Sequence, residues 1–108
     1  MIKVKLYYNK NNHIYGFKVL NHGDSFVCAG VSALVITCVN FIQSQLDIDL
    51  EQEHDAKDGG YISFTLPLLK QGGIDDKATL ILNHMAFGLR QIEENYKDQV
   101  KIFEKVSE

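Results

Sequence analysis

The stretch that decides the fold is residues 26–45, FVCAGVSALVITCVNFIQSQ. It contains no proline and no strict alternation of apolar and polar residues, and it is long enough for about five helical turns, so it predicts a helix rather than a strand. Asp24 or Ser25 can cap this helix, because either side chain accepts a hydrogen bond from the free N–H groups of the first turn. Apolar residues lie on nearly all sides of it. We therefore expect a sheet on one side and either a second helix or a partner subunit on the other.

Two strands are predicted before this helix. Residues 3–8 alternate apolar and polar side chains, and residues 14–20 form a second strand-like segment. The asparagine-rich residues 9–12 between them favour a turn, since asparagine tolerates left-handed backbone conformations. The first twenty residues are therefore predicted to form a hairpin.

After the first helix, the acidic residues 47–58 are predicted to form a surface loop. Their charge is typical of a solvated face, although it could also attract a basic peptide. Gly59 and Gly60 then turn the chain into a third strand, residues 61–66. Pro67 either ends this strand or places it at a sheet edge, because proline lacks the N–H that a central strand donates.

A second helix is predicted for residues 77–97, capped by Asp75 or Asp76, and a last strand for residues 100–106. The apolar residues of this helix form one stripe: Ile81, Met85, Leu89, Ile92 and Tyr96. The element order is then ββαβαβ. This order predicts an α+β fold, a two-layer sandwich with two helices packed on one sheet face, in a single domain spanning residues 1–108.

Composition narrows the class of protein. The chain has 108 residues, 45% of them hydrophobic and 23% charged, with a net charge of −3, which is typical of a globular domain. No strongly basic stripe is visible in the sequence, so no direct binding of nucleic acid is expected. The longest apolar stretch is shorter than the ~20 residues that a bilayer requires, and the first residues alternate like a strand, so we expect a cytoplasmic protein without membrane contact. Its two cysteines are then expected to be thiols.

The residues that could carry chemistry lie where the second strand gives way to the first helix. His22 follows the strand, and Cys28 lies near the first helical turn, where free N–H groups and the helix dipole favour a thiolate. An imidazole close by can take the thiol proton, and helix-terminal N–H groups can hold an oxyanion. Ser32 lies one turn after Cys28 on the same face, where its hydroxyl could contact the sulfur or a substrate. Asp24 could orient the imidazole or cap the helix.

This segment resembles the signature of the ribosomal-processing cysteine proteases (Prp), in which a Gly-His pair precedes a helix that opens with Cys-Ala-x-x-Ser-Ala. His22 matches the family's catalytic histidine, Cys28 matches its nucleophile, and residues 29–34 continue the helix motif. Asn21 replaces the usual glycine before the histidine, Gly23 replaces a small residue that is commonly alanine, and the loop between histidine and cysteine is short.

The resemblance implies a cysteine endopeptidase without a cofactor. It assigns catalysis to His22 and Cys28, with Ser32, Asp24 and Ala29 as supporting or substrate-binding residues. The implied substrate is the basic and hydrophobic N-terminal extension of a ribosomal protein, the twenty-seventh of the large-subunit series. A homodimer is also expected, because a second subunit would supplement the small core.

Two alternatives remain open at this stage. The same fold could bind a ribosomal protein or an assembly factor without cutting it, or Cys28 could serve acyl transfer or redox sensing. Redox exchange is disfavoured because Cys38 lies ~15 Å further along the helix and is read as inert core. His13, His54 and His84 lack partners at metal-ligand spacing, so no metal is expected.

Overall fold

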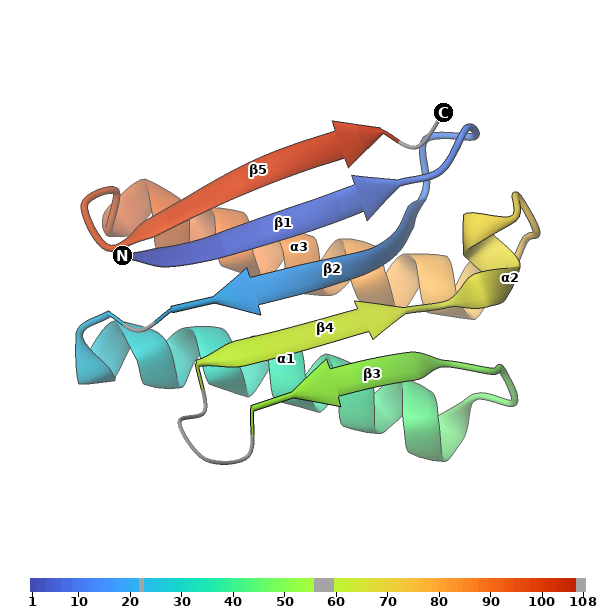
Figure 1. Cartoon of the computed structure of the whole chain (residues 1–108), viewed down its shortest axis with the longest axis horizontal. Helices are drawn as coiled ribbons and strands as arrows, with labels where there is room; N and C mark the ends of the chain where they lie inside the picture. Colours follow the sequence, from blue (N-terminus) through green and yellow to red (C-terminus); the bar gives the residue numbers. More distant parts are fainter. Residues whose placement is uncertain (22, 56–59, 107–108) are drawn as a thin grey trace.

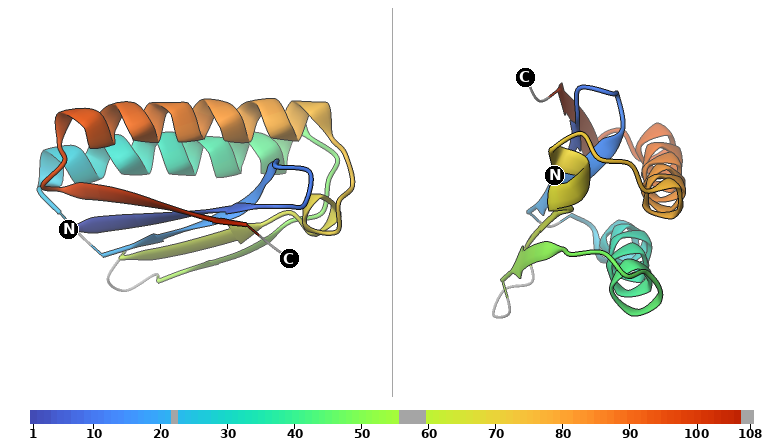
Figure 2. Two further views of the ribbon diagram at one scale, coloured as in Figure 1. Left: turned by 90° about the horizontal axis from the view of Figure 1, so that it is seen from above. Right: turned by 90° about the vertical axis from the view of Figure 1, so that its right-hand side faces the viewer.

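Strands and helices form two separate layers in the computed structural model, which describes residues 1–21, 23–55 and 60–106 (Figure 1). The two long helices lie side by side on one face of a five-stranded sheet (Figure 2). The predicted α+β sandwich is therefore confirmed. The elements are, in chain order, β1 (Ile2–Tyr8), β2 (Ile14–Leu20), α1 (Ser25–Gln45), β3 (Glu51–His54), β4 (Tyr61–Thr65), α2 (Pro67–Lys70), α3 (Asp76–Asn95) and β5 (Val100–Val106).

The strand order across the sheet is β3-β4-β2-β1-β5. The β1–β5 pair is parallel and the other pairs are antiparallel. Leu6 pairs with Phe17 and Phe17 with Phe64, so the three side chains share the face that the helices cover. The rings of Phe17 and Phe64 stack with centroids 5.2 Å apart and form the centre of the core.

The second layer consists of α1 and α3, which pack against each other as well as on the sheet. Gly88 of α3 permits this close approach, because a Cβ atom there would lie 2.9 Å from the Leu34 side chain of α1. By length and composition alone, α1 could cross a membrane. In this fold α1 packs on the sheet and beside α3. Its buried residues are Val27, Val31, Val35, Cys38, Val39 and Ile42.

The element order departs from the prediction at two places. Glu51–His54, predicted as part of a surface loop, forms the edge strand β3, and Pro67 begins the short helix α2 after ending β4. All four residues of β3 are exposed, so no apolar alternation marks the strand, and its backbone pairing with β4 alone defines it. Proline suits the start of α2 because its missing N–H has no partner in a first turn.

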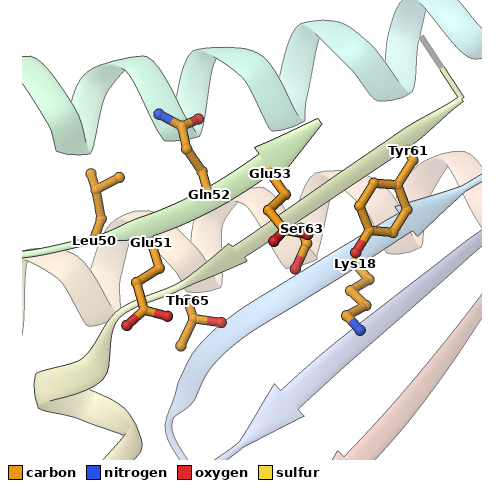
Figure 3. A pocket seen from close by; sticks show the side chains of 8 residues that line it. All are labelled: Lys18, Leu50, Glu51, Gln52, Glu53, Tyr61, Ser63 and Thr65. Atoms are coloured by element: carbon orange, nitrogen blue, oxygen red, sulfur yellow. The ribbon is translucent and has the colours of Figure 1, made fainter. Parts of the chain in front are cut away.

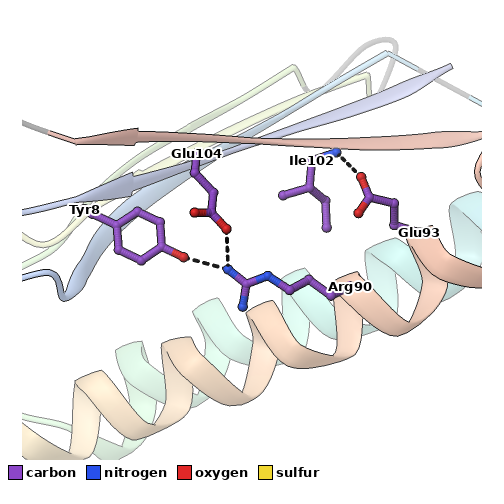
Figure 4. Close-up of polar contacts among 5 residues, drawn as sticks. All are labelled: Tyr8, Arg90, Glu93, Ile102 and Glu104. Atoms are coloured by element: carbon purple, nitrogen blue, oxygen red, sulfur yellow. Dashed lines mark hydrogen bonds and ion pairs between the residues drawn. The ribbon is translucent and has the colours of Figure 1, made fainter.

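Polar contacts join α3 to β1 and to the edge strand β5 (Figure 4). Arg90 donates to the Tyr8 hydroxyl at 2.7 Å and to Glu104 at 2.8 Å. Glu93 accepts from the Ile102 N–H at 2.7 Å. The Arg90–Glu104 ion pair is about half exposed and stabilises little, but the Glu93 contact satisfies a donor of the edge strand β5.

Candidate active site

Cys28 is the fourth residue of α1, at the end of its first turn. Its thiol is free and half-buried. The N-cap is Asp24, whose Oδ1 accepts from the Phe26 N–H at 2.9 Å, while its carbonyl accepts from the Cys28 N–H at 2.8 Å. The predicted capping role of Asp24 is therefore confirmed, and the thiol lies at the positive end of a well-capped helix.

The strand end that leads to this helix has an unusual backbone. Asn21 has φ 72°, in the left-handed region, and its N–H donates to the Gly60 carbonyl at 2.8 Å. Glycine adopts this conformation most easily and asparagine tolerates it better than most residues. Asn21 can therefore stand where the family resemblance has a glycine, because the position selects for backbone freedom.

Gln99, which lies just before β5, supports the loop between β2 and α1. Its Oε1 accepts from the Asp24 N–H at 3.0 Å, and its carbonyl accepts from the Ile2 N–H at 2.8 Å. A Cβ atom on Gly23 would lie 3.1 Å from the same Oε1, so the loop passes close to this side chain. Sequence reasoning missed Gln99, since it is 75 residues from Asp24 and no local pattern marks it.

The thiol opens onto a narrow hollow of about 20 Å³, which has room for about one water molecule. A larger apolar groove of about 300 Å³ lies between α1 and the β3–β4 edge, and Ser32, Tyr61 and Ile62 line both spaces. The two therefore adjoin. The hollow is lined by Ile2, Val19, Asn21, Cys28, Val31, Ser32, Val35, Gly60, Tyr61 and Ile62, and the groove adds Ile36, Val39, Asn40, Gln52, His54 and Asp55.

The structure brings some of the predicted site residues together and not others. Cys28, Ser32 and Asn21 line one hollow, whereas Ala29 is exposed and lines neither space. His22 lies outside the described residues, so its pairing with Cys28 stays a prediction.

The second cysteine has a different environment. Cys38 is buried within the core, and this burial raises the pKa of its thiol to about 12. It is therefore protonated at neutral pH, in keeping with the prediction of an inert residue. Within residues 1–21, 23–55 and 60–106, no group of three or more histidine, cysteine or acidic side chains could hold a metal ion.

Comparison with known proteins gives the same family at the level of sequence and of structure. The family model described as Cysteine protease Prp matches residues 1–101. The ribosomal processing cysteine protease Prp of Bacillus subtilis (strain 168) is 34% identical over 87 residues, covering 75% of this chain and 71% of that protein.

Among solved structures, the essential ribosomal processing protease Prp from S. aureus, in complex with a covalently linked product peptide, superposes with a TM-score of 0.84 at 28% identity. That match covers 97% of this chain and 100% of the other. The same S. aureus protease with a substrate peptide gives a TM-score of 0.82 at 26% identity over 97% and 100% of the two chains.

A half-buried thiol at a helix N-terminus, beside an apolar groove and in a chain with these relatives, defines a cysteine protease. The chain belongs to the Prp family of cysteine proteases.

Proposed function

We propose that this protease removes the N-terminal extension of a ribosomal protein, the twenty-seventh of the large-subunit series, in the cytoplasm. The observation that carries the proposal is the position of Cys28. Its thiol is free, and Cys28 lines a small hollow that adjoins a groove large enough for peptide side chains. The Bacillus subtilis relative is a ribosomal processing protease, and the S. aureus relative has been solved with substrate and product peptides.

The proposed reaction proceeds through an acyl-enzyme. The Cys28 sulfur, as thiolate, attacks the scissile carbonyl, and the resulting thioester forms as the C–N bond breaks. His22 takes the thiol proton and gives it to the leaving amine. It then removes a proton from the water that hydrolyses the thioester. Asn21, the residue before His22, lines the same hollow as Cys28, which supports this pairing.

The first turn of α1 also limits which N–H groups can hold the oxyanion. Asp24 accepts from the N–H groups of Phe26 and Cys28, through its side chain and its carbonyl respectively. Among the described residues, the N–H groups of Ser25 and Val27 have no such partner and are the available donors in this turn.

The groove provides the place for substrate side chains. Ile36 is 46% exposed although it lies on α1 next to the sheet, and the side chain of Ile62 lies on the opposite wall, at the start of β4. Such a surface suits an apolar residue of a bound peptide, which would shield it from water. Ser32 lies between the groove and Cys28 and is placed to contact the substrate near the cleaved bond.

Cleavage of the N-terminal peptide of this ribosomal protein tests the proposal. The wild type, Cys28→Ala and the matched control Cys38→Ala are incubated with the peptide, and the products are identified by mass spectrometry. We expect a single cut by the wild type and by Cys38→Ala, and none by Cys28→Ala. Cutting by Cys28→Ala would show that the Cys28 thiol is not the nucleophile. If none of the three proteins cuts the peptide, the peptide is not a substrate.

The alternative of a non-catalytic binding module makes a different prediction for the same samples. The wild type and Cys28→Ala would then bind the peptide equally well, and neither would cut it. Cys28 would also react with iodoacetamide at the rate of an ordinary thiol. A burst of alkylation at Cys28 at neutral pH, with Cys38 unmodified, would favour the protease.

We also infer that the protein acts as a homodimer that uses the outer side of the helix layer. Leu80 and Phe87 of α3 are 68% and 64% exposed, and Phe41 of α1 is 42% exposed. An apolar hollow of about 300 Å³ lies between the two helices beside Phe41. Exposed aromatic and aliphatic side chains next to a hollow are typical of interfaces.

A further inference from the structure

The face of the sheet that the helices leave open carries an unusual concentration of lysine. Because side chains alternate along a strand, the residues that pair with one another share a face. Lys5 of β1 pairs with Lys18 of β2, and Lys3 of β1 pairs with Lys101 of β5. Lys105 lies two residues further along β5, opposite Tyr7. All five lysines therefore project from the open face, across three neighbouring strands.

Four of these lysines, Lys3, Lys5, Lys101 and Lys105, pair with no acidic residue, whereas Lys18 lines a hollow with Glu51 and Glu53. In the part of the chain that the structure describes, the ion pair is Arg90–Glu104, which lies on the helix side. Like charges directly across two strands oppose folding. Lysines on an edge strand can be explained as protection against aggregation, which accounts for Lys101 and Lys105 on β5. That explanation does not apply to Lys5 and Lys18, because β1 and β2 are interior strands.

Aromatic rings lie between the lysines. Phe103 pairs with Lys5 and is 39% exposed, and Tyr7 pairs with Lys105. The ring of Tyr15, in the bulge of β2, lies 6.0 Å from that of Tyr7. A surface that combines aromatic rings with cations suits single-stranded nucleic acid, because the rings can stack on bases while the lysines contact phosphates.

An acidic border limits this surface at the β3 edge. Glu51 and Glu53 project from the open face beside a shallow hollow of about 590 Å³, and Lys18, Tyr61, Ser63 and Thr65 line its other side (Figure 3). The two carboxylates would repel phosphates. The basic surface is thus confined to β2, β1 and β5, and the described residues of these three strands place no carboxylate on the open face.

We propose that the open sheet face is a binding site for single-stranded RNA, formed by Lys3, Lys5, Lys18, Lys101 and Lys105 with Tyr7 and Phe103. The site is separate from the thiol, because α1 and the groove beside Cys28 lie on the opposite side of the sheet. The protein can therefore hold RNA on one face while a peptide occupies the other. The choice of RNA rests on the proposed ribosomal substrate, which would bring RNA close to the protease.

Fluorescence anisotropy with a labelled 12-nucleotide single-stranded RNA of mixed sequence tests the site. The double variant Lys3→Gln/Lys101→Gln is compared with a matched control, Lys70→Gln/Lys77→Gln, which removes the same charge from exposed positions on α2 and α3. Each phosphate contact contributes about 0.7 to the slope of log K against log salt for a single strand. We expect the face variant to lose about 1.4 from that slope, and the control to bind like the wild type.

Phe103→Leu tests the stacking contribution separately. It should weaken binding at least about fivefold, since a stacked base contributes that much or more, while the salt slope stays at the wild-type value. Circular dichroism confirms that each variant is folded. Peptide cleavage should be unchanged in all of them, so a failure of this site can be distinguished from a failure of the protease.

Three outcomes would overturn the proposal. The wild type could fail to bind the RNA at 50 mM salt, or the face variant and the control could lose affinity equally. The third outcome is that the wild type binds anionic phospholipid vesicles or polyglutamate as tightly as it binds the RNA. This result would show that the face attracts any polyanion and that the aromatic rings give no preference for bases.

Discussion

At the scale of single residues, Asn21 combines an unusual backbone conformation with a position next to the predicted base. It holds φ 72° directly before the predicted base. We predict that Asn21→Ala lowers the free energy of unfolding by about 1 kcal/mol, because an alanine Cβ is strained in the left-handed region. Asn21→Gly should retain or slightly raise stability, since glycine adopts this backbone freely. Urea denaturation of the three proteins measures the difference.

Comparison of the two variants separates the effect of the backbone conformation on stability from that of the asparagine side chain. If glycine and alanine destabilise the protein equally, the asparagine side chain matters and the interpretation of this position as a glycine equivalent is wrong. Cleavage rates should follow the same order as stability, because the backbone turn places the residue that follows.

Cys38 makes stability depend on pH in the alkaline range. Its pKa is raised by burial from 9.0 in the unfolded chain to about 12 in the fold. The unfolded chain therefore loses this proton first, so the stabilisation is complete below pH 9 and is lost as pH rises toward 12. At pH 10 the loss attributable to Cys38 should be about 1.4 kcal/mol.

The variant Cys38→Ala isolates this effect, because it removes the thiol and leaves every other titrating group in place. The difference in unfolding free energy between wild type and variant, measured in urea from pH 7 to pH 10.5, should be constant up to about pH 8.5 and then shrink. A difference that stays constant across the whole range would mean that the thiol titrates normally in the fold.

At the scale of elements, Gln99 links the start of β5 to the N-cap of α1. We predict that Gln99→Ala lowers kcat/KM about tenfold or more, since small displacements of a catalytic loop strongly reduce the rate. The stability cost should be only about 1 kcal/mol, the net value of one hydrogen bond. Gln91→Ala, an exposed glutamine on α3, is the matched control and should change neither quantity. Peptide cleavage together with thermal unfolding decides the question, and equal losses in the two variants would exclude a positioning role for Gln99.

The elements that sequence reasoning found are those with a clear period. The hairpin of β1 and β2 alternates, and both long helices place their buried residues at helical spacing. β3 has no such signal, because an edge strand with four exposed residues is defined by its pairing partner. The same limit applies to the site. Cys28 and Asp24 stand out locally, whereas Gln99 and Tyr61 reach the site only through the tertiary fold.

At the scale of the whole molecule, the alternation of side chains along strands makes a basic surface hard to recognise in the sequence. The chain has a net charge of −3 and no run of basic residues, so the sequence predicted no binding of nucleic acid. Alternation separates Lys3 from Lys5 and Lys101 from Lys105 along the chain, and then collects all four on one face of the sheet. A negative net charge therefore argues against the binding of a polyanion only when the fold does not gather the basic side chains on one face.

The outer side of the helix layer makes the remaining prediction at this scale. If Phe87 and its exposed neighbours form a dimer interface, the wild type should sediment at twice the 12.3 kDa of one chain. Phe87→Asp should then convert it to monomers, because a buried carboxylate without a partner opposes association. Ile74→Asp makes the same change at a side chain that is 69% exposed but lies in the loop before α3, and it should leave the dimer intact. Sedimentation velocity at several protein concentrations distinguishes these results. A monomeric wild type would assign the exposed apolar side chains of α3 to some other contact, and dissociation by Ile74→Asp as well as Phe87→Asp would place the interface nearer to α2.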